Sequence, residues 1–448
     1  MTTNSKLYFL AAMVLLTGCE SFLNVKPNQK LATPASIEDL QALLNNSSFL
    51  NTRDPAAGEV SADNYYLTQN DWNTLYYESD RRMYTWEKDF IFPEFPNDWS
   101  NLYQIVYFSN TVLEQLENMN PADLQFDNVK GQALFFRSKA FLQAAWIWCH
   151  SYDESARSSL GIPLRLTTDF NEVSIRSSLH DTYNRIIEDL TLSSSLLPDR
   201  SVHPRRPAKA AAFALLANTF LSMGNFSEAK RFADSCLTIK NDLLDFNELD
   251  ASANYPIPQS NNEIIFESYT PPPSTLSARV AKIDTLLYSQ YAENDLRKVI
   301  FFVENEDGSH GFKGNFTGGP ALFTGTTVGE VYLIRAECAA RLGDAEGALA
   351  DLNTLLNARY DETYFEPFDG QALTGDVLQT ILLERRKELL MRGLRWVDLK
   401  RLNNEGFGIE IRRNLGDDRY VLPPNDSRYA LPIPEDVVNI SGMPQNNR

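Results

Sequence analysis

The sequence predicts a mainly α-helical protein in which helical hairpins form a scaffold and long irregular segments are inserted between the helices. Four helical segments form two pairs, 209–223 with 227–237 and 328–342 with 345–357. In each pair the chain turns at a glycine, Gly224 or Gly343, and an alanine, Ala217 or Ala336, lies seven residues before that glycine. Small residues at this spacing let two antiparallel helices approach closely, which predicts hairpins of the tetratricopeptide type.

Two further helices are expected before these hairpins. From Trp99 onwards, apolar residues such as Val106 and Leu113 recur with helical spacing, and a second helical segment covers about 129–148. We expect these two helices to pack as a pair. In the first hairpin, Ser227 is the predicted N-cap of the return helix, because a serine hydroxyl satisfies free backbone N–H groups at that position.

Residues 377–402 are predicted to form one amphipathic helix. Its apolar face carries Leu378, Ile381, Leu382, Leu389, Trp396 and Val397. Glu388 precedes Arg392 by four residues and Arg395 precedes Asp398 by three, so that each pair is adjacent on a helix surface. We therefore expect this segment to carry its own ion pairs.

Long segments interrupt the helical scaffold, which we place at about 99–240 and 328–402. The interruptions are residues 28–98 and 245–327; the second contains three consecutive prolines and a glycine-rich stretch. Loops of this length in a compact protein are usually functional. We therefore predict that residues 28–448 form one domain whose two insertions carry the binding surface.

The N-terminus has the pattern of a bacterial lipoprotein signal. Lys6 is followed by ten apolar or small residues, and Thr17-Gly18 stands directly before Cys19. The apolar run is too short to span a bilayer, which needs about 20 residues. We expect residues 1–18 to be a signal peptide, Cys19 to be acylated, for example with palmitate, and 19–27 to be a tether. An ordinary signal, or a buried core segment, with an incidental cysteine is the alternative.

Charge excludes one class of partner. Removing residues 1–18 takes away one lysine and no acidic residue, which leaves 430 residues with a formal charge of −19. Phosphate groups would be repelled, so nucleic acid is not an expected partner. Cys149, Cys236 and Cys338 stand singly in apolar or helical stretches and are predicted to be buried thiols.

Aromatic residues are concentrated in the first insertion and the helix after it. Of the 44 residues from Tyr65 to Phe108, 14 are aromatic, about 32% against 11% for the chain. Sugar rings stack on aromatic faces, while their hydroxyls need carboxylates, amides or guanidinium groups. The candidate ligand-binding residues are Asp63, Asn64, Tyr65, Tyr66, Trp72, Tyr76, Tyr77, Arg81 and Trp86.

The alternative interpretation is that these side chains pack inside the protein and do not bind a ligand. Large aromatics are more often buried than functional, and Asp63-Asn64 is also typical of a turn after Ser61. Five aromatics are assigned to packing at the outset: Phe90, Phe92, Phe95, Trp99 and Tyr103. A weaker candidate group in the second insertion is Phe312, Phe316 and Phe323.

Catalytic motifs are not found. The four histidines never have the H-E-x-x-H spacing, and the sequence has neither a G-x-S-x-G elbow nor a P-loop. We therefore predict no catalytic residue, no metal ligand and no cofactor. A glycoside hydrolase remains the enzymatic alternative, because it needs only two suitably placed carboxylates among 59 acidic residues.

Several motifs together resemble a known family. They are Glu384-Arg385-Arg386, Glu388-Leu389, Arg392-Gly393, Arg395-Trp396 and Asp398-Leu399, followed by Leu431-Pro432-Ile433-Pro434 and Met443-Pro444-Gln445-Asn446. Near the N-terminus, Cys19-Glu20 and the segment from Phe22 to Pro27 fit the same pattern. This order of motifs resembles the SusD/RagB family of Bacteroidetes outer-membrane lipoproteins.

The resemblance implies a function that the residues alone do not establish. Members of that family are non-enzymatic, lie on the cell surface, cap a SusC-like TonB-dependent transporter and capture glycans or, in some branches, peptides. We therefore expect an oligosaccharide-binding lipoprotein of the outer membrane, with a peptide-binding relative or a scaffold that binds only proteins as alternatives. In that family the hairpins face the transporter, so Glu384, Arg395 and Asp398 are expected to be structural.

Overall fold

The computed structural model describes residues 34–369 and 376–447. The predicted signal peptide 1–18, the anchor Cys19 and the tether 19–27 lie outside the described residues. Within them, no helix has the length and apolar character that crossing a membrane requires. The three predicted thiols, Cys149, Cys236 and Cys338, are free and buried, as expected.

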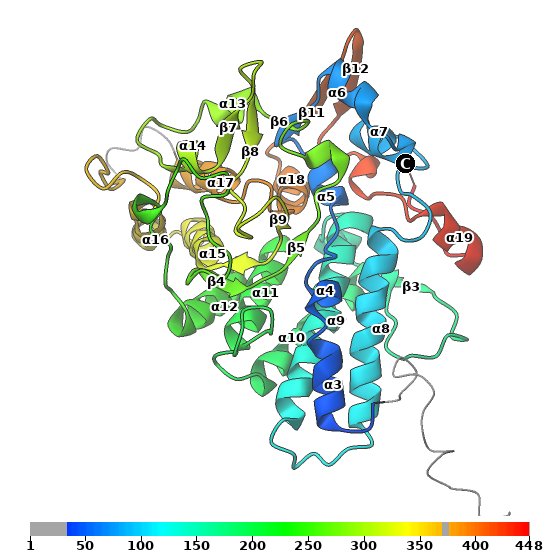
Figure 1. Cartoon of the computed structure of the whole chain (residues 1–448). Helices are drawn as coiled ribbons and strands as arrows, with labels where there is room; N and C mark the ends of the chain where they lie inside the picture. The colour runs from blue at the N-terminus through cyan, green and yellow to red at the C-terminus, as the bar shows by residue number, and fades with distance from the viewer. Residues whose placement is uncertain (1–33, 370–375, 448) are drawn as a thin grey trace, which may run out of the picture.

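A row of long helices forms the scaffold and confirms the mainly α-helical prediction. These helices are α8 (Asp98–Leu116), α9 (Phe126–Trp148), α10 (Leu179–Leu196), α11 (Lys209–Ser222), α12 (Phe226–Ile239), α15 (Val328–Arg341) and α16 (Ala345–Asn357). Each packs against the next in chain order, so that the row is continuous from α8 to α16 (Figure 1). The expected pair of α8 and α9 is therefore confirmed.

The two predicted hairpins form and also pack on each other. Gly224 and Gly343 adopt left-handed backbone conformations, with φ of 73° and 86°, and Ala217 and Ala336 are fully buried. Helices α12 and α15 lie side by side although a long insertion separates them in sequence. The prediction that Ser227 is the N-cap is wrong. Helix α12 begins at Phe226, and its N-cap is Asn225, whose side chain accepts a hydrogen bond from the backbone N–H of Glu228.

Helix α10 was not anticipated. Its N-cap is Ser178, whose side chain accepts a hydrogen bond from the backbone N–H of Asp181. It joins the row through a buried ion pair in which Arg137 donates to both carboxylate oxygens of Asp189, at 2.8 and 2.9 Å. The same guanidinium donates to Asn110 at 3.0 Å, so one side chain links α8, α9 and α10.

The single helix predicted for 377–402 is interrupted. Two helices form instead, α17 (Val377–Glu388) and α18 (Arg395–Asn404). Between them Met391 and Gly393 take positive φ values of 58° and 76°, which end α17 and redirect the chain. The predicted local ion pairs are replaced by distant ones, since Arg392 pairs with Glu330 and Arg395 pairs with Asp63.

Both insertions contain short regular elements rather than irregular chain alone. The first holds α3 (Ile37–Leu44), α4 (Ser47–Leu50), α5 (Ala57–Ser61), β1 (Tyr65–Tyr66), α6 (Gln69–Thr74) and α7 (Glu78–Tyr84). The second holds β4 (Ile264–Phe266), β5 (Tyr269–Thr270), β6 (Lys282–Ile283), α13 (Thr285–Tyr288), α14 (Arg297–Ile300), β7 (Phe302–Glu304), β8 (His310–Phe312), β9 (Leu322–Phe323) and β10 (Thr326–Thr327).

The remaining strands and the last helix lie outside the insertions. They are β2 (Leu160–Pro163), β3 (Arg176–Ser178), β11 (Ile411–Leu415), β12 (Asp418–Leu422) and α19 (Glu435–Ser441). All described sheets are two-stranded and antiparallel: β1 with β6, β2 with β3, β4 with β10, β5 with β9, β7 with β8, and β11 with β12. The first of these pairs joins the two insertions directly.

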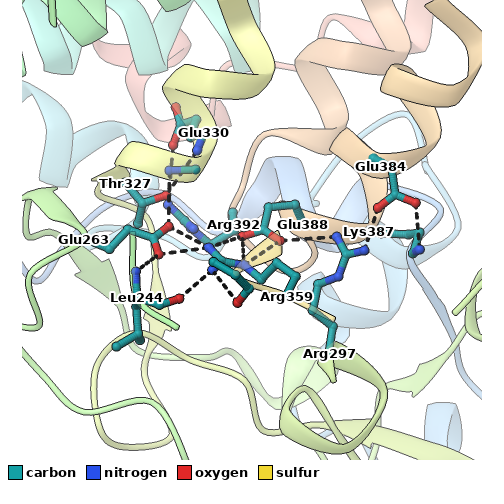
Figure 2. A network of polar contacts seen from close by, with 12 residues as sticks. Leu244, Glu263, Arg297, Thr327, Glu330, Arg359, Glu384, Lys387, Glu388 and Arg392 are labelled. Atoms are coloured by element: carbon teal, nitrogen blue, oxygen red, sulfur yellow. Dashed lines mark hydrogen bonds and ion pairs between the residues drawn. The ribbon is translucent and has the colours of Figure 1, made fainter. Parts of the chain in front are cut away.

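A buried ion network fastens the second insertion to the scaffold (Figure 2). Arg359, which follows α16, lies 2.8 Å from Glu263 and 2.9 Å from Glu388. Arg297 of α14 lies 3.3 Å from the same Glu388 and 2.5 Å from Glu384 of α17. The side chains of these five residues are almost completely buried, so each charge depends on its partners within the network.

A buried carboxyl group joins the first insertion to the break between α17 and α18. Glu59 of α5 accepts hydrogen bonds from Asn64 Nδ2 at 2.8 Å and from the backbone N–H of Gly393 at 3.0 Å. Burial raises the pKa of Glu59 from 4.5 to about 7, and these two hydrogen bonds only partly oppose the shift. Glu59 therefore retains its proton in the folded protein at pH values where the unfolded chain has released it.

The network predicts a large cost for removing its central cation. Arg359→Ala leaves Glu263 and Glu388 without their main partner, and the free energy of unfolding is expected to fall by about 3–5 kcal/mol. As a control, Arg231→Ala removes an exposed ion pair with Glu228 and is expected to cost less than about 1 kcal/mol. Chemical denaturation of both variants measures these changes. Equal losses of unfolding free energy in the two variants would contradict the central role assigned to Arg359.

The raised pKa of Glu59 predicts a pH-dependent stability difference. The stability that protonated Glu59 contributes is complete below pH 4.5 and is lost as the pH rises through about 7. Glu59→Gln removes this titration, so between about pH 5 and about pH 8 the wild type is expected to lose up to about 3 kcal/mol relative to the variant. Denaturation curves across this range test the prediction, which fails if the difference stays constant.

Candidate functional site

The two insertions meet around a surface hollow of about 280 Å³. Tyr66 and Thr68 line it from the first insertion, and the second contributes Ile283, Thr285, Gly308, Ser309 and the four side chains Lys282, Tyr288, Asp307 and His310. In Figure 1 the contributing segments, from β1 to α6 and from β6 to β8, lie at the upper end of the molecule. Both predicted binding insertions therefore supply side chains to this hollow.

Short local elements fix the walls of the hollow. The register of β1 and β6 sets Tyr66 opposite Lys282, and Tyr65 opposite Ile283. After β1, Thr68 caps α6 in a reciprocal capping box with Asp71. After β6, Asp284 caps α13, the helix that ends at Tyr288.

A lysine held between two carboxylates forms the charged part of the site. Lys282 Nζ lies 3.5 Å from Asp71 Oδ2 and 3.2 Å from Asp307 Oδ2. Hydrogen bonds from Ser309, and then from Lys282, lower the pKa of Asp307 from 3.8 to about 2. Lys282 is buried while Asp307 is exposed, so the hollow offers a fixed carboxylate to solvent beside a positive charge.

A stacked aromatic pair forms the flat part of the site. The rings of Tyr288 and His310 are parallel within 19° with centroids 3.7 Å apart, and both residues are half-buried. Burial lowers the pKa of His310, which favours the neutral imidazole. With Tyr66 on the opposite strand, the hollow combines aromatic surface with a charged pair, the two features that carbohydrate recognition requires.

Five of the nine sequence-predicted candidates lie at or near the surface of the first insertion. Tyr66 lines the hollow. Tyr76 and Tyr77, between α6 and α7, are 83% and 60% exposed and meet edge to face at 4.9 Å. Trp72 and Arg81 are half-buried and brace α6 against α7, since Trp72 Nε1 donates to the Arg81 carbonyl at 3.4 Å.

Two predicted candidates, Tyr65 and Trp86, belong to the interior. Trp86 is only 2% exposed, and its Nε1 donates to the Ser61 carbonyl at 3.0 Å. The Tyr65 hydroxyl donates to the Val60 carbonyl at 2.9 Å. The guanidinium of Arg413 lies against both rings, 4.4 Å from Trp86 and 5.5 Å from Tyr65. Both were predicted to stack on a ligand, and because their rings are buried they are not available for this.

The predicted polar pair Asp63-Asn64 is also occupied internally. Asp63 accepts from Arg395 Nε at 2.6 Å, and Arg386 lies 3.3 Å from its second oxygen. Burial opposes ionisation, but these two cations hold the pKa of Asp63 below its ordinary value. Because Asn64 donates to Glu59, the pair anchors the first insertion instead of facing solvent.

The other aromatic assignments divide between interior and surface. Phe92 and Trp99 are buried as expected, and Tyr103 is half-buried. Phe90 and Phe95 contradict their assignment to packing, since both are exposed. The weaker candidates Phe312, Phe316 and Phe323 are buried and cannot present their rings to a ligand.

Sequence reasoning missed Lys282, Tyr288, Asp307 and His310. Only the general expectation of a binding surface in the second insertion pointed toward them. No regular spacing marks these residues, because Lys282, Tyr288 and His310 come from three short elements and Asp307 from the turn between β7 and β8, which only the tertiary structure brings together. Within the described ranges, no group of three or more His, Cys, Asp or Glu residues is arranged to hold a metal ion.

Two family models match the chain. A model described as starch-binding associating with outer membrane matches residues 21–221, and a model of the SusD family matches residues 328–447. The SusD-like protein P2 of Formosa agariphila is 24% identical over 422 residues, which cover 78% of this chain and 79% of that protein.

Solved structures share the fold. A SusD superfamily protein of Bacteroides thetaiotaomicron is 21% identical, with a TM-score of 0.73 and coverage of 92% of this chain and 100% of that one. A SusD-like carbohydrate binding protein of Bacteroides vulgatus is 19% identical, with a TM-score of 0.66 and coverage of 90% and 96%. The helical row, the chain order of its motifs and both family models lead to one conclusion: this chain belongs to the SusD/RagB family.

Proposed function

We propose that this protein is a surface-exposed lipoprotein that captures an oligosaccharide in the hollow between its two insertions and delivers it to a SusC-like TonB-dependent outer-membrane transporter. The single observation that carries the proposal is the pairing, in one hollow, of the Tyr288–His310 stack with the Lys282–Asp307 ion pair. Family membership and a relative named as carbohydrate binding support the ligand class. Binding is noncovalent, and no catalytic step is assigned.

The chemistry of each wall suits a sugar. The aromatic faces receive the C–H face of a ring, and excluding water there is favourable by roughly 25 cal/mol per Å² of apolar surface. Asp307 accepts hydrogen bonds from sugar hydroxyls, and the ammonium of Lys282 donates to them. We assign contacts with a longer chain to Tyr76 and Tyr77, whose rings are exposed on the loop after α6 in the same insertion.

Removing the stacked ring tests glycan capture. Tyr288→Ala is expected to weaken retention in gels containing soluble polysaccharides, each used separately, by about tenfold in affinity, or about 1.4 kcal/mol. Tyr288 is half-buried and its ring also packs on Phe302, so a modest fall in melting temperature is expected, and retention is compared well below the melting temperature of the variant. Tyr364→Ala removes an exposed ring elsewhere and serves as the matched control.

Three outcomes would reject glycan capture by this hollow. The first is unchanged retention of Tyr288→Ala on a polysaccharide that retains the wild type. The second is binding of peptides but of no glycan in isothermal titration, which would favour the peptide-binding alternative. The third is release of shorter products from a polysaccharide, which would indicate a glycoside hydrolase.

The lipid anchor predicts a change in cell fractionation. Cys19→Ala removes the only proposed acylation site, and the chain is expected to leave the outer-membrane fraction because the protein part has no other proposed anchor. Immunoblots of membrane and soluble fractions measure this. Because binding to the proposed transporter would also hold the chain at the membrane, the fractions are taken from cells that lack that transporter, and retention there would contradict the anchor. Co-purification of a TonB-dependent transporter with the tagged wild type tests the interaction that delivery requires.

A further inference from the structure

A second cleft, of about 360 Å³, lies apart from the hollow of the insertions. Its floor is one face of α8, formed by Trp99, Tyr103, Val106 and Tyr107. One wall is the segment between β2 and β3, and the other is α19 with the residues that follow it. In Figure 1, α19 and the segment leading to β3 lie on the same side of the molecule as α8.

The rim of this cleft is apolar and exposed. Phe170 and Ile440, on opposite walls, are 82% and 88% exposed. Phe170 stacks on Tyr107 of the floor, with ring centroids 5.1 Å apart and an interplanar angle of 30°. Val173 and Ile175, on the same wall as Phe170, are also exposed. Single exposed apolar residues are ordinary, but a cluster of them around a cleft marks an interaction site.

Most polar side chains of the floor and walls are already engaged within the protein. The Tyr103 hydroxyl donates to the Pro163 carbonyl at 2.8 Å, and Asn110 Nδ2 donates to the Arg165 carbonyl at 3.0 Å. The hydroxyls of Thr167, Thr168 and Ser441 donate to Glu172, Glu114 and the Val437 carbonyl, and Ser174 accepts from Arg165. A sugar needs many free hydrogen-bonding groups, so this cleft favours apolar side chains over carbohydrate.

The charge around the cleft is negative. Glu435 and Asp436, at the start of α19, accept from the backbone N–H groups of Phe90 and Phe95, which places those two exposed rings beside the α19 wall. Glu94 and Glu172 add exposed carboxylates. The cation that lines the cleft, Arg165, lies 3.8 Å from Glu172 and donates to the carbonyls of residues 169 and 172.

The negative charge around the cleft distinguishes between the apolar ligands that the cleft could bind. Anionic lipid surfaces would be repelled, and so would a second copy of a chain whose formal charge is −18. A polypeptide with lysine or arginine beside its apolar side chains would instead be attracted, because opposite potentials across an interface favour encounter and register.

We propose that the cleft between α8, the β2–β3 segment and α19 is a docking site for a polypeptide segment of a partner protein, one that inserts apolar side chains flanked by lysine or arginine. The inference does not depend on the glycan proposal, because the two surfaces share no lining residue.

Peptide selection tests this docking site with a defined probe. A random peptide library is panned on the full-length Cys19→Ala chain and counter-selected with the same chain carrying Phe170→Ser and Ile440→Ser. Peptides that combine apolar residues with lysine or arginine are expected to be enriched. In fluorescence anisotropy, the double substitution should weaken the best peptide at least tenfold, because both side chains leave the rim.

Matched controls separate docking from loss of folding. Leu286→Ser and Tyr364→Ser remove comparably exposed side chains elsewhere, and the peptide affinity of both variants should equal that of the wild type. Added salt should weaken the basic peptide, and a version with glutamate in place of its lysines and arginines should not bind.

Four results would overturn the inference, and each points to a different alternative. Enrichment of no peptide, or of peptides that bind the double variant equally well, excludes a peptide site. Flotation with anionic vesicles that the double substitution abolishes indicates a membrane surface, and a dimer that it dissociates indicates a second copy. Loss of polysaccharide retention in the double variant would assign the cleft to glycan.

Discussion

The buried charges around Arg359 and Glu388 are the constraint on which the rest of the structure depends. Removing charged groups from water costs several kcal/mol for each ion, and the cost is offset only when every charge meets a well-placed partner. Here the partners come from distant parts of the chain: Glu263 and Arg297 from the second insertion and Glu388 from α17. The insertion and the helical row therefore have to adopt their relative position together.

A second set of charges fixes the first insertion in the same way. Asp63 pairs with Arg395 and Arg386 on either side of the break in α17–α18, and Glu59 binds the backbone N–H of Gly393 within that break. Both insertions are thus held by the same C-terminal segment. The hollow between them needs no large core of its own, because the insertions that carry Tyr66 and Tyr288 are both held in place by their ion pairs with this C-terminal segment.

Local periodicity predicted the scaffold well, and tertiary charge pairing explains where the predictions failed. The hairpins at Gly224 and Gly343 follow from small residues and turn glycines that are visible in the sequence. The break near Met391 was not predictable from helical spacing, since it depends on ion pairs with residues more than 60 positions away. For the site, Tyr66 was found by aromatic density, but the same signal selected Trp86 and Tyr65, whose rings pack on Arg413. Lys282 and His310 carry no local signal.

The two surfaces differ in a way that residue content alone does not reveal. Both contain tyrosines and acidic groups. In the hollow the Asp307 carboxylate accepts from Ser309 and pairs with Lys282, but it is more than half exposed and can accept further hydrogen bonds from a ligand. Around the α8 cleft most hydroxyl and amide groups are bound to neighbouring backbone and side chains. What a surface binds is set by the groups left unsatisfied after folding. An aromatic surface with open polar partners suits a hydroxyl-rich ligand. The α8 cleft, in which most polar groups are already hydrogen-bonded, offers mainly apolar contact area. The carboxylates around it then favour a partner that carries positive charge.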